Sequence, residues 1–152
     1  MGHTRNSIFI KAPYSLVFDV SNHIERWTEL FGDEYVKAEV LSRVGNEITF
    51  RLTDDENKSW VSKRWLYKDL KFAYASRHDP MFPFVYMKII WLFHETKDGT
   101  LMTWIQDFEM DPNAKFNDEQ VEGFINEHSQ HNLKIFKRVI EKEAQQLQAS
   151  HK

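Results

Sequence analysis

The stretch that decides the fold is Asp118 to Leu147, with the sequence DEQVEGFINEHSQHNLKIFKRVIEKEAQQL. Apolar residues recur in it at steps of three and four, the period of one helix face; they are Val121, Ile125, Ile135, Phe136, Val139 and Ile140. On the same winding, His128 and Asn132 fall in the centre of the apolar stripe. A buried polar group without a partner costs about 1–3 kcal/mol, so each is either a paired core residue or part of a cavity wall. Two on one stripe favour a helix that covers a cavity.

Composition narrows the class of protein. A chain of 152 residues with a net charge of −3 and intermixed Lys and Glu predicts one domain, residues 1–152, without a nucleic-acid footprint. The absence of cysteine excludes disulfides, thiol catalysis and Cys-based zinc sites. We see no N-terminal apolar segment and no long apolar run, so we expect a cytoplasmic protein without a membrane partner. The 5 Trp, 5 Tyr and 12 Phe suit a core and also a pocket for planar or apolar ligands.

The order of predicted elements indicates an α+β fold. Alternation at Ile8, Ile10 and Ala12 predicts a first strand that ends at Pro13, and residues 13–31 fit two short helices separated and N-capped at Ser21-Asn22. Six further strands are predicted at residues 35–42, 47–52, 59–67, 72–78, 84–95 and 101–110. No linker or repeat divides the chain. Runs of strands followed by a helix predict a seven-stranded antiparallel sheet wrapped on the C-terminal helix.

Strand parity predicts which side chains face inward, because successive side chains alternate between the two faces. The inner sets on the last two strands are Val85, Met87, Ile89, Trp91 and Phe93, and Met102, Trp104, Gln106 and Phe108. On the strand at 59–67, Trp60, Ser62 and Arg64 share a face, but parity does not say which face is inward. Arg64 is either exposed, paired with a carboxylate such as Glu34, or placed in a pocket where it binds a developing oxyanion.

Short motifs along nearly the whole chain carry a family resemblance. They are Thr4-Arg5-Asn6-Ser7-Ile8, Ala12-Pro13, Leu16-Val17, Trp27-Thr28-Glu29-Leu30-Phe31, Glu34-Tyr35, Trp60-Val61-Ser62-Lys63-Arg64, Pro83-Phe84-Val85-Tyr86-Met87, Trp91, Trp104-Ile105-Gln106-Asp107-Phe108 and Asn132. With these motifs the chain resembles the aromatase/cyclases of bacterial aromatic polyketide synthesis, of the tetracenomycin and spore-pigment type. That family belongs to the START-like (Bet v 1-like) helix-grip superfamily.

The resemblance implies a curved sheet around the long helix, two short helices after the first strand, and an interior cavity. It implies that Arg64 and Tyr35 are the catalytic pair. Substrate-binding wall residues would be Trp27, Phe31, Trp60, Ser62, Phe84, Met87, Trp91, Trp104, Gln106 and Asn132, with His128 added from the helix stripe. His78 is counted among these substrate-binding wall residues and stands where relatives carry a second arginine. The polar turn at 54–58 is shorter than in relatives, which leaves room for a different substrate fit.

The implied substrate is a linear poly-β-ketone on an acyl carrier protein, delivered by a minimal polyketide synthase. The implied reaction is an intramolecular aldol that closes the first ring, followed by loss of water, without cofactor or metal. Arg64, which stays protonated, would stabilise the developing enolate or alkoxide, and Tyr35 would donate a proton. His78 and His128 are candidate bases because imidazole ordinarily titrates near neutrality.

Other classes of function lack sequence support or differ in what they require. His128 and His131 lie three residues apart beside Glu127, but no His-Glu-x-x-His motif is present, so we expect no metal. Ser62 lies within a strand and not in a Gly-x-Ser-x-Gly elbow. A non-catalytic lipid or hydrophobic-ligand carrier of the same fold would need only an apolar lining. An interaction module would have a collapsed core. We expect a monomer or a weak homodimer.

Overall fold

The predicted strands form one open antiparallel sheet in a computed structural model that describes residues 1–150. Its order is β1-β7-β6-β5-β4-β3-β2, so β1 and β2 are the edges. The strands are β1 (Gly2–Ile10), β2 (Lys37–Val44), β3 (Glu47–Thr53), β4 (Ser59–Tyr67), β5 (Phe72–Asp79), β6 (Phe84–Thr96) and β7 (Gly99–Met110). The seven-stranded α+β prediction is confirmed.

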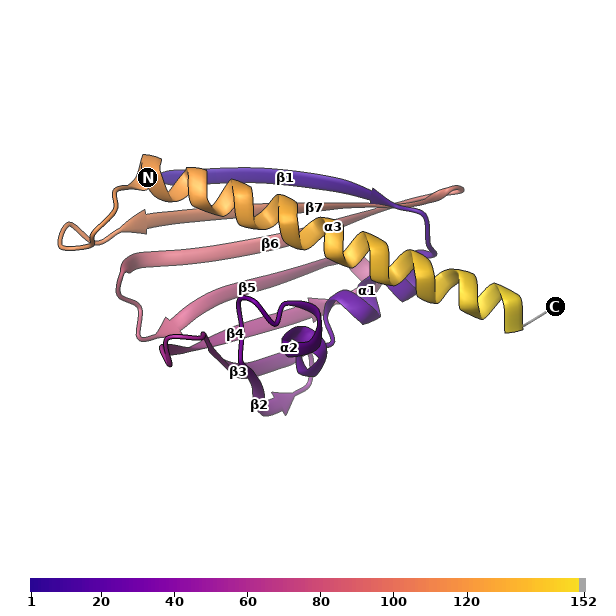
Figure 1. Ribbon diagram of the computed structural model, residues 1–152, viewed down its shortest axis with the longest axis horizontal. Helices are drawn as coiled ribbons and strands as arrows, with labels where there is room; N and C mark the ends of the chain where they lie inside the picture. Colours follow the sequence, from indigo (N-terminus) through magenta and orange to yellow (C-terminus); the bar gives the residue numbers. More distant parts are fainter. Residues whose placement is uncertain (151–152) are drawn as a thin grey trace.

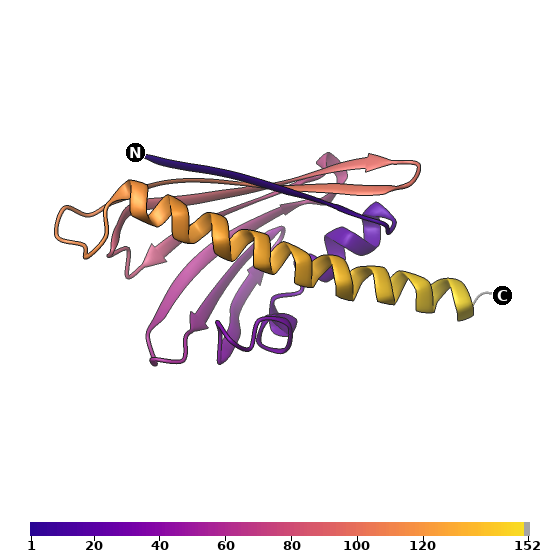
Figure 2. The same ribbon diagram turned by 45° about the horizontal axis from the view of Figure 1, so that its top comes forward.

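Three α-helices accompany the sheet: α1 (Tyr14–Ser21), α2 (Trp27–Leu30) and α3 (Asp118–Ser150), with 3₁₀ turns at Ile24–Arg26 and Lys68–Leu70. Figures 1 and 2 show α3 crossing the concave side of the curved sheet, with β1 running alongside it. This is the helix-grip architecture. None of the helices within residues 1–150 combines the length and apolarity that a membrane crossing needs.

Helix α3 begins where the sequence provides a cap. Asn117 Oδ1 accepts a hydrogen bond from the Gln120 amide at 2.9 Å, and the Gln120 side chain accepts one from the Asn117 amide at 3.0 Å. These reciprocal bonds satisfy amides that the first turn leaves free. The acidic Asp118 and Glu119 in that turn oppose the positive end of the helix dipole.

The buried face of α3 differs from the predicted stripe at one turn. Asn132 is buried as predicted, but the His128 side chain is 65 % exposed. Ser129 is the buried polar residue of that turn. Ser129 lies four residues before the fully buried Leu133 and seven before Phe136, near the middle of the buried face, whereas His128 lies at the edge of that face and at the rim of the cavity.

Two strands, β1 and β6, differ locally from the predicted alternation of apolar inward and polar outward residues. β1 runs from Gly2 to Ile10, and two of its buried positions, Thr4 and Asn6, carry polar side chains. Asn6 exchanges hydrogen bonds with two α3 side chains, Asn126 at 3.0 Å and Gln130 at 2.8 Å. In β6 the register shifts between Phe84 and Tyr86, so the predicted inward Val85 is 46 % exposed.

The break at Ser21-Asn22 lies where it was predicted, but Asn22 caps the C-terminus of α1 and not the N-terminus of the next helix. Asn22 ends α1, and its Nδ2 donates to the Phe18 carbonyl at 2.9 Å. No side chain caps the following 3₁₀ turn, whose first flanking residue is His23. The Asn22 oxygen is instead available to a residue of the sheet.

The turn between β6 and β7 depends on a glycine, and Gly99→Ala should destabilise the fold. A Cβ at Gly99 would overlap the Ile10 carbonyl oxygen and approach the Phe9 ring to 2.8 Å. We expect a loss of about 1–3 kcal/mol and a visibly lower thermal midpoint by circular dichroism. Gly123→Ala is the control: its Cβ meets nothing within 4 Å, and alanine should stabilise α3 by about 0.5–1 kcal/mol. Equal midpoints for the two variants would contradict this account.

Candidate functional site

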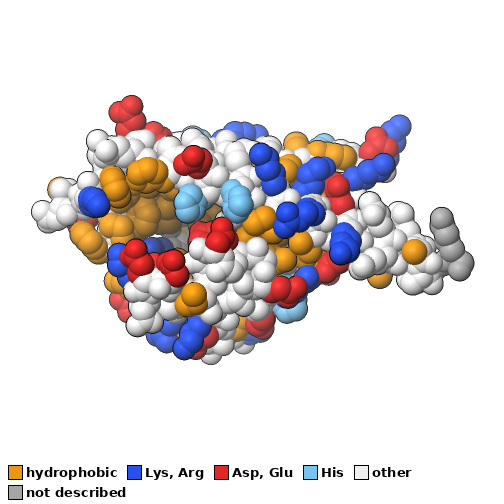
Figure 3. Space-filling view, in the orientation of Figure 1, with side chains coloured by type: hydrophobic (Ala, Val, Ile, Leu, Met, Phe, Trp, Pro, Cys, Tyr) orange, Lys and Arg blue, Asp and Glu red, His pale blue; other side chains and the backbone are white. Residues whose placement is uncertain are grey.

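A cavity of about 310 Å³ lies between α3 and the concave face of the sheet. Figure 3 shows its mouth as a hollow lined with hydrophobic side chains, on a face where histidine and acidic side chains lie side by side. The predicted residues that line it are Trp27, Phe31, Tyr35, Trp60, Ser62, Arg64, Phe84, Met87, Trp91, Trp104, Gln106, His128 and Asn132. The cavity argues against a collapsed interaction module, and its volume lies in the range of small-molecule sites.

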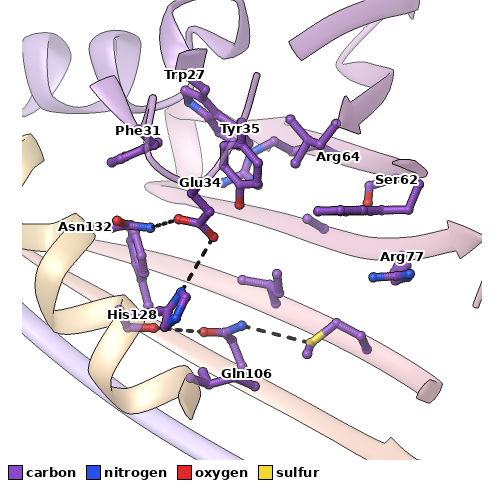
Figure 4. Close-up of a pocket in the computed structure, with 18 of the residues that line it drawn as sticks. Trp27, Phe31, Glu34, Tyr35, Ser62, Arg64, Arg77, Gln106, His128 and Asn132 are labelled. Carbon is purple, nitrogen blue, oxygen red and sulfur yellow. Dashed lines mark hydrogen bonds and ion pairs between the residues drawn. The ribbon is translucent and has the colours of Figure 1, made fainter. Parts of the chain in front are cut away.

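Arg64 faces this cavity from β4 and is only 2 % exposed. Its Nε donates to Asn22 Oδ1 at 2.8 Å, and its guanidinium lies 3.9 Å from the centroid of the Trp91 ring and 5.5 Å from that of Trp27. Within residues 1–150 no carboxylate pairs with it, so pairing with Glu34, the alternative left open by parity, is wrong. Arg64 thus lies on the cavity wall beside Trp27 and Tyr35 without a carboxylate partner (Figure 4).

Burial lowers the pKa of Arg64 to about 9, because the apolar surroundings disfavour the cation. The guanidinium still carries its proton at neutral pH. Two tryptophan faces offset part of the desolvation through cation–π contacts. The result is a fixed positive charge in a mostly aromatic cavity, where a charge interacts more strongly than it does in water.

Tyr35 is half-buried at the start of the segment that leads into β2, and it is held by aromatic neighbours. Its ring stacks near Trp27 at 6.4 Å and meets the edge of Trp60 at 6.1 Å. Burial and then the Glu34 carboxylate raise the Tyr35 pKa well above its ordinary value of 10, while Arg64 partly opposes this. The hydroxyl is therefore a proton donor at neutral pH and not a base.

The second cavity arginine is Arg77, and the assignment of His78 to the wall is wrong. A bulge in the β4–β5 pairing joins Val61 to Asp79 and Ser62 to Arg77, which leaves His78 as the extra residue. His78 is exposed and hydrogen-bonded to Ser76 Oγ at 2.9 Å. Arg77 lines the cavity, lies 5.0 Å from the Trp60 ring, and donates to the carbonyls of Pro80 and Phe82.

Glu34 is a cavity residue that the sequence prediction missed as part of the site. Its Oε2 accepts a hydrogen bond from Asn132 Nδ2 at 2.9 Å, and its Oε1 lies 3.9 Å from His128 Nδ1 (Figure 4). The carboxylate is 28 % exposed, so it lies just inside the rim, whereas His128 forms part of the rim. Asn132 on the buried stripe of α3 was the signal, because such an amide needs a partner.

A second pair of polar side chains, Ser129 on α3 and Gln106 on β7, forms a hydrogen bond on the cavity wall. Ser129 on α3 donates to Gln106 Oε1 at 3.1 Å, which points the Gln106 amide nitrogen toward Met87 Sδ at 4.0 Å (Figure 4). Sulfur is a weak acceptor, so this N–H can bind a ligand carbonyl instead. In the described part of the chain no three His, Asp or Glu side chains converge as metal ligands.

Comparison with known proteins identifies the family. The model of the family described as "Polyketide cyclase / dehydrase and lipid transport" matches residues 1–141. A Streptomyces cyaneus protein named "Putative polyketide cyclase" is 46 % identical over 145 residues, which cover 92 % of this chain and 94 % of the relative. A Streptomyces halstedii protein of the same name is 44 % identical over 109 residues, covering 68 % of this chain and 98 % of the relative.

Solved structures confirm the fold. The ZhuI aromatase/cyclase of Streptomyces sp. R1128 superposes with a TM-score of 0.76 at 18 % identity, covering 94 % of this chain and 93 % of that one. A START superfamily protein of Mycobacterium smegmatis gives 0.71 at 15 % identity, covering 97 % and 99 %. The resemblance drawn from the sequence motifs is thus confirmed, and the chain belongs to the polyketide cyclase/dehydrase and lipid-transport family, with the START-like helix-grip fold.

Proposed function

We propose that this protein is an aromatase/cyclase that closes the first ring of a linear poly-β-ketone and removes water from it. Its family supports a role in polyketide biosynthesis. The observation that carries the finer proposal is Arg64, a protonated guanidinium with no carboxylate partner among the described residues, buried in an aromatic cavity. An uncompensated buried charge is costly, so its retention points to a ligand that develops negative charge.

Ring closure depends more on how the poly-β-ketone substrate is bent than on a strong base. A methylene between two carbonyls is already acidic, and it attacks a ketone further along the same chain. Holding the two in a near-attack geometry can contribute about 7–11 kcal/mol at the upper limit. In this proposal the aromatic walls fix the bend of the chain, and Gln106 and Ser62 orient carbonyl groups. Arg64 binds the oxygen on which charge develops, and Tyr35 gives that oxygen a proton.

A non-catalytic carrier of a hydrophobic ligand is the alternative, since the fold also serves lipid transport. A carrier would need only the apolar part of the lining. Arg64 and Tyr35 line the same cavity, one as a fixed cation and the other as a proton donor. This pairing favours the enzyme.

The partners in this proposal are an acyl carrier protein that presents the poly-β-ketone and a minimal polyketide synthase that makes it. We also propose that residues 1–152 act as a single domain. A cytoplasmic location and a monomeric or weakly dimeric state stay predictions.

The test is a product profile. A minimal polyketide synthase is reconstituted alone, with the wild-type protein and with its Arg64→Ala variant, and the products are identified by mass spectrometry and NMR. We expect the wild type to replace a mixture of shunt products with one aromatic regiochemistry, and Arg64→Ala to lose this effect. Identical mixtures in all three reactions, together with tight binding of several chain lengths without turnover, would instead establish the carrier.

A further inference from the structure

The proposed ring closure requires a group that accepts a proton, and the two predicted catalytic residues cannot supply one. Arg64 keeps its proton at neutral pH, and Tyr35 holds its hydroxyl proton more tightly than free tyrosine does. Arg77 is a second guanidinium. Among the titratable side chains that line the cavity in residues 1–150, only Glu34 and His128 remain as proton acceptors.

Geometry distinguishes these two. The Glu34 carboxylate comes from the loop between α2 and β2, reaches into the cavity beside Tyr35, and is fixed at one oxygen by Asn132 at 2.9 Å (Figure 4). Its other oxygen, Oε1, lies 3.9 Å from His128 Nδ1, beyond hydrogen-bond distance, and the Tyr35 hydroxyl is a hydrogen-bonding neighbour of the same carboxylate. His128 is mostly exposed on the rim, where water competes for it. A carboxylate that Asn132 anchors inside the cavity and that lies next to the Tyr35 hydroxyl is well placed to accept a proton and pass it to that hydroxyl.

The acidic residue before Glu34 does not share this position. Asp33 is 70 % exposed, points to His131 at 3.6 Å, and does not line the cavity. The two consecutive carboxylates therefore face the same helix with different surroundings, one outside and one inside. This pair supplies a control within the same loop.

We propose that Glu34 is the general base of this cavity, with Asn132 as the positioning residue that holds its carboxylate. The proposal rests on the aromatase/cyclase function and names the residue that starts its reaction. Glu34 takes a proton from the methylene between two carbonyls, and the C–H electron pair becomes the enolate. The enolate carbon bonds to the ketone carbon, and the C=O electron pair moves to oxygen as an alkoxide beside Arg64.

The proton then returns within the cavity. Tyr35 gives its hydroxyl proton to the alkoxide and regains one from the protonated Glu34, which restores the carboxylate. Glu34 next removes the second proton of the same carbon, the hydroxyl group departs with its electron pair, and that proton completes a molecule of water. Atoms and electrons balance with water as the only product lost, so no oxidant or reductant is needed.

The first step can be measured without ring closure. A β-ketoamide too short to cyclise is incubated in D₂O with the protein, and loss of its methylene hydrogens is followed by NMR above the spontaneous rate. We expect Glu34→Gln to lower the protein-dependent exchange and the cyclisation rate by at least about 10²-fold. Binding of the β-ketoamide, followed by tryptophan fluorescence, should be retained. Glu34→Asp should recover part of the exchange, because it keeps a carboxylate.

Asp33→Asn makes the same chemical change one residue away and should exchange and cyclise like the wild type. Tyr35→Phe should exchange but not complete the ring, since it lacks the proton donor and keeps the base. Wild-type exchange and cyclisation together with an equally active Glu34→Gln would overturn the role of Glu34 and leave the cyclase function standing. A wild type that neither exchanges nor alters polyketide products would overturn both.

Discussion

Arg64→Met is expected to lower the rate of ring closure by about 10²–10³-fold, the usual cost of removing one preorganised donor to a developing oxyanion. The methionine side chain fills much of the same space between Trp91 and Trp27, so the shape of the cavity is largely kept. What is lost is the positive charge and its N–H groups. Single-turnover rates with a reconstituted polyketide synthase measure the change.

The same substitution is expected not to destabilise the protein. Burial lowers the pKa of Arg64 to about 9, well below its ordinary value, so the folded state holds its proton less tightly than the unfolded state does. Its burial therefore costs free energy at neutral pH, and that cost is relieved only as pH rises above about 9. Methionine removes the cost at every pH but leaves Asn22 Oδ1 without its partner. We expect a net gain of about 1 kcal/mol, or about 2–4 °C in Tm.

Two controls separate charge from fold. Arg51→Met removes an exposed arginine from the neighbouring strand β3 and should change neither rate nor Tm. Wild-type activity should also fall above pH about 9, where Arg64 loses its proton, and the residual activity of Arg64→Met should lack this alkaline fall. A Tm for Arg64→Met well below that of the wild type would show that Arg64 holds the fold together and would refute its interpretation as a purely functional charge.

Inward-facing residues on regular strands could be predicted from the sequence because alternation is a local property. Met102, Trp104, Gln106 and Phe108 lie on the inner face of β7 as predicted. Alternation fails where a strand carries an extra residue, and two such places border the cavity. The bulge opposite Val61 and Ser62 turns Arg77 inward and His78 outward, and the shift after Phe84 exposes Val85. Nothing in the apolar pattern marks either bulge.

The hydrogen-bond partners of buried polar residues were the second feature that could not be predicted from the sequence. Asn132 was predicted to be either paired or part of a cavity wall, and its partner, Glu34, comes from 98 residues away in the chain. The buried Asn6 in β1 could not be predicted from local alternation, because its hydrogen-bond partners, Asn126 and Gln130, lie far away in the chain on α3. The family motifs place Glu34 beside Tyr35, but only the fold shows that the carboxylate points into the cavity. Sequence reasoning therefore named Arg64 and Tyr35 as the catalytic pair and did not name Glu34, the acceptor that we propose.

Phe136→Ala is expected to cause the largest loss of stability. Phe136 is fully buried on α3 and meets the edges of three rings: Phe31 at 5.0 Å, and Trp91 and Trp104 at 5.9 Å each. Trp91 and Trp104 are themselves stacked at 4.6 Å, so Phe136 supports the aromatic end of the cavity. Its removal should cost about 3–5 kcal/mol and lower Tm by about 6–20 °C, because a rigid aromatic wall cannot collapse into the space.

The matched control is Phe124→Ala on the same helix. Phe124 also lines the cavity but is 43 % exposed at its rim, so its loss opens little internal space and should change stability by less than about 1 kcal/mol. Denaturant unfolding of both variants measures the difference. Phe136→Ala should also yield a mixture of ring regiochemistries, since an enlarged cavity no longer fixes the bend of the chain. A single wild-type product from a destabilised Phe136→Ala would mean that the cavity wall does not select which carbons join.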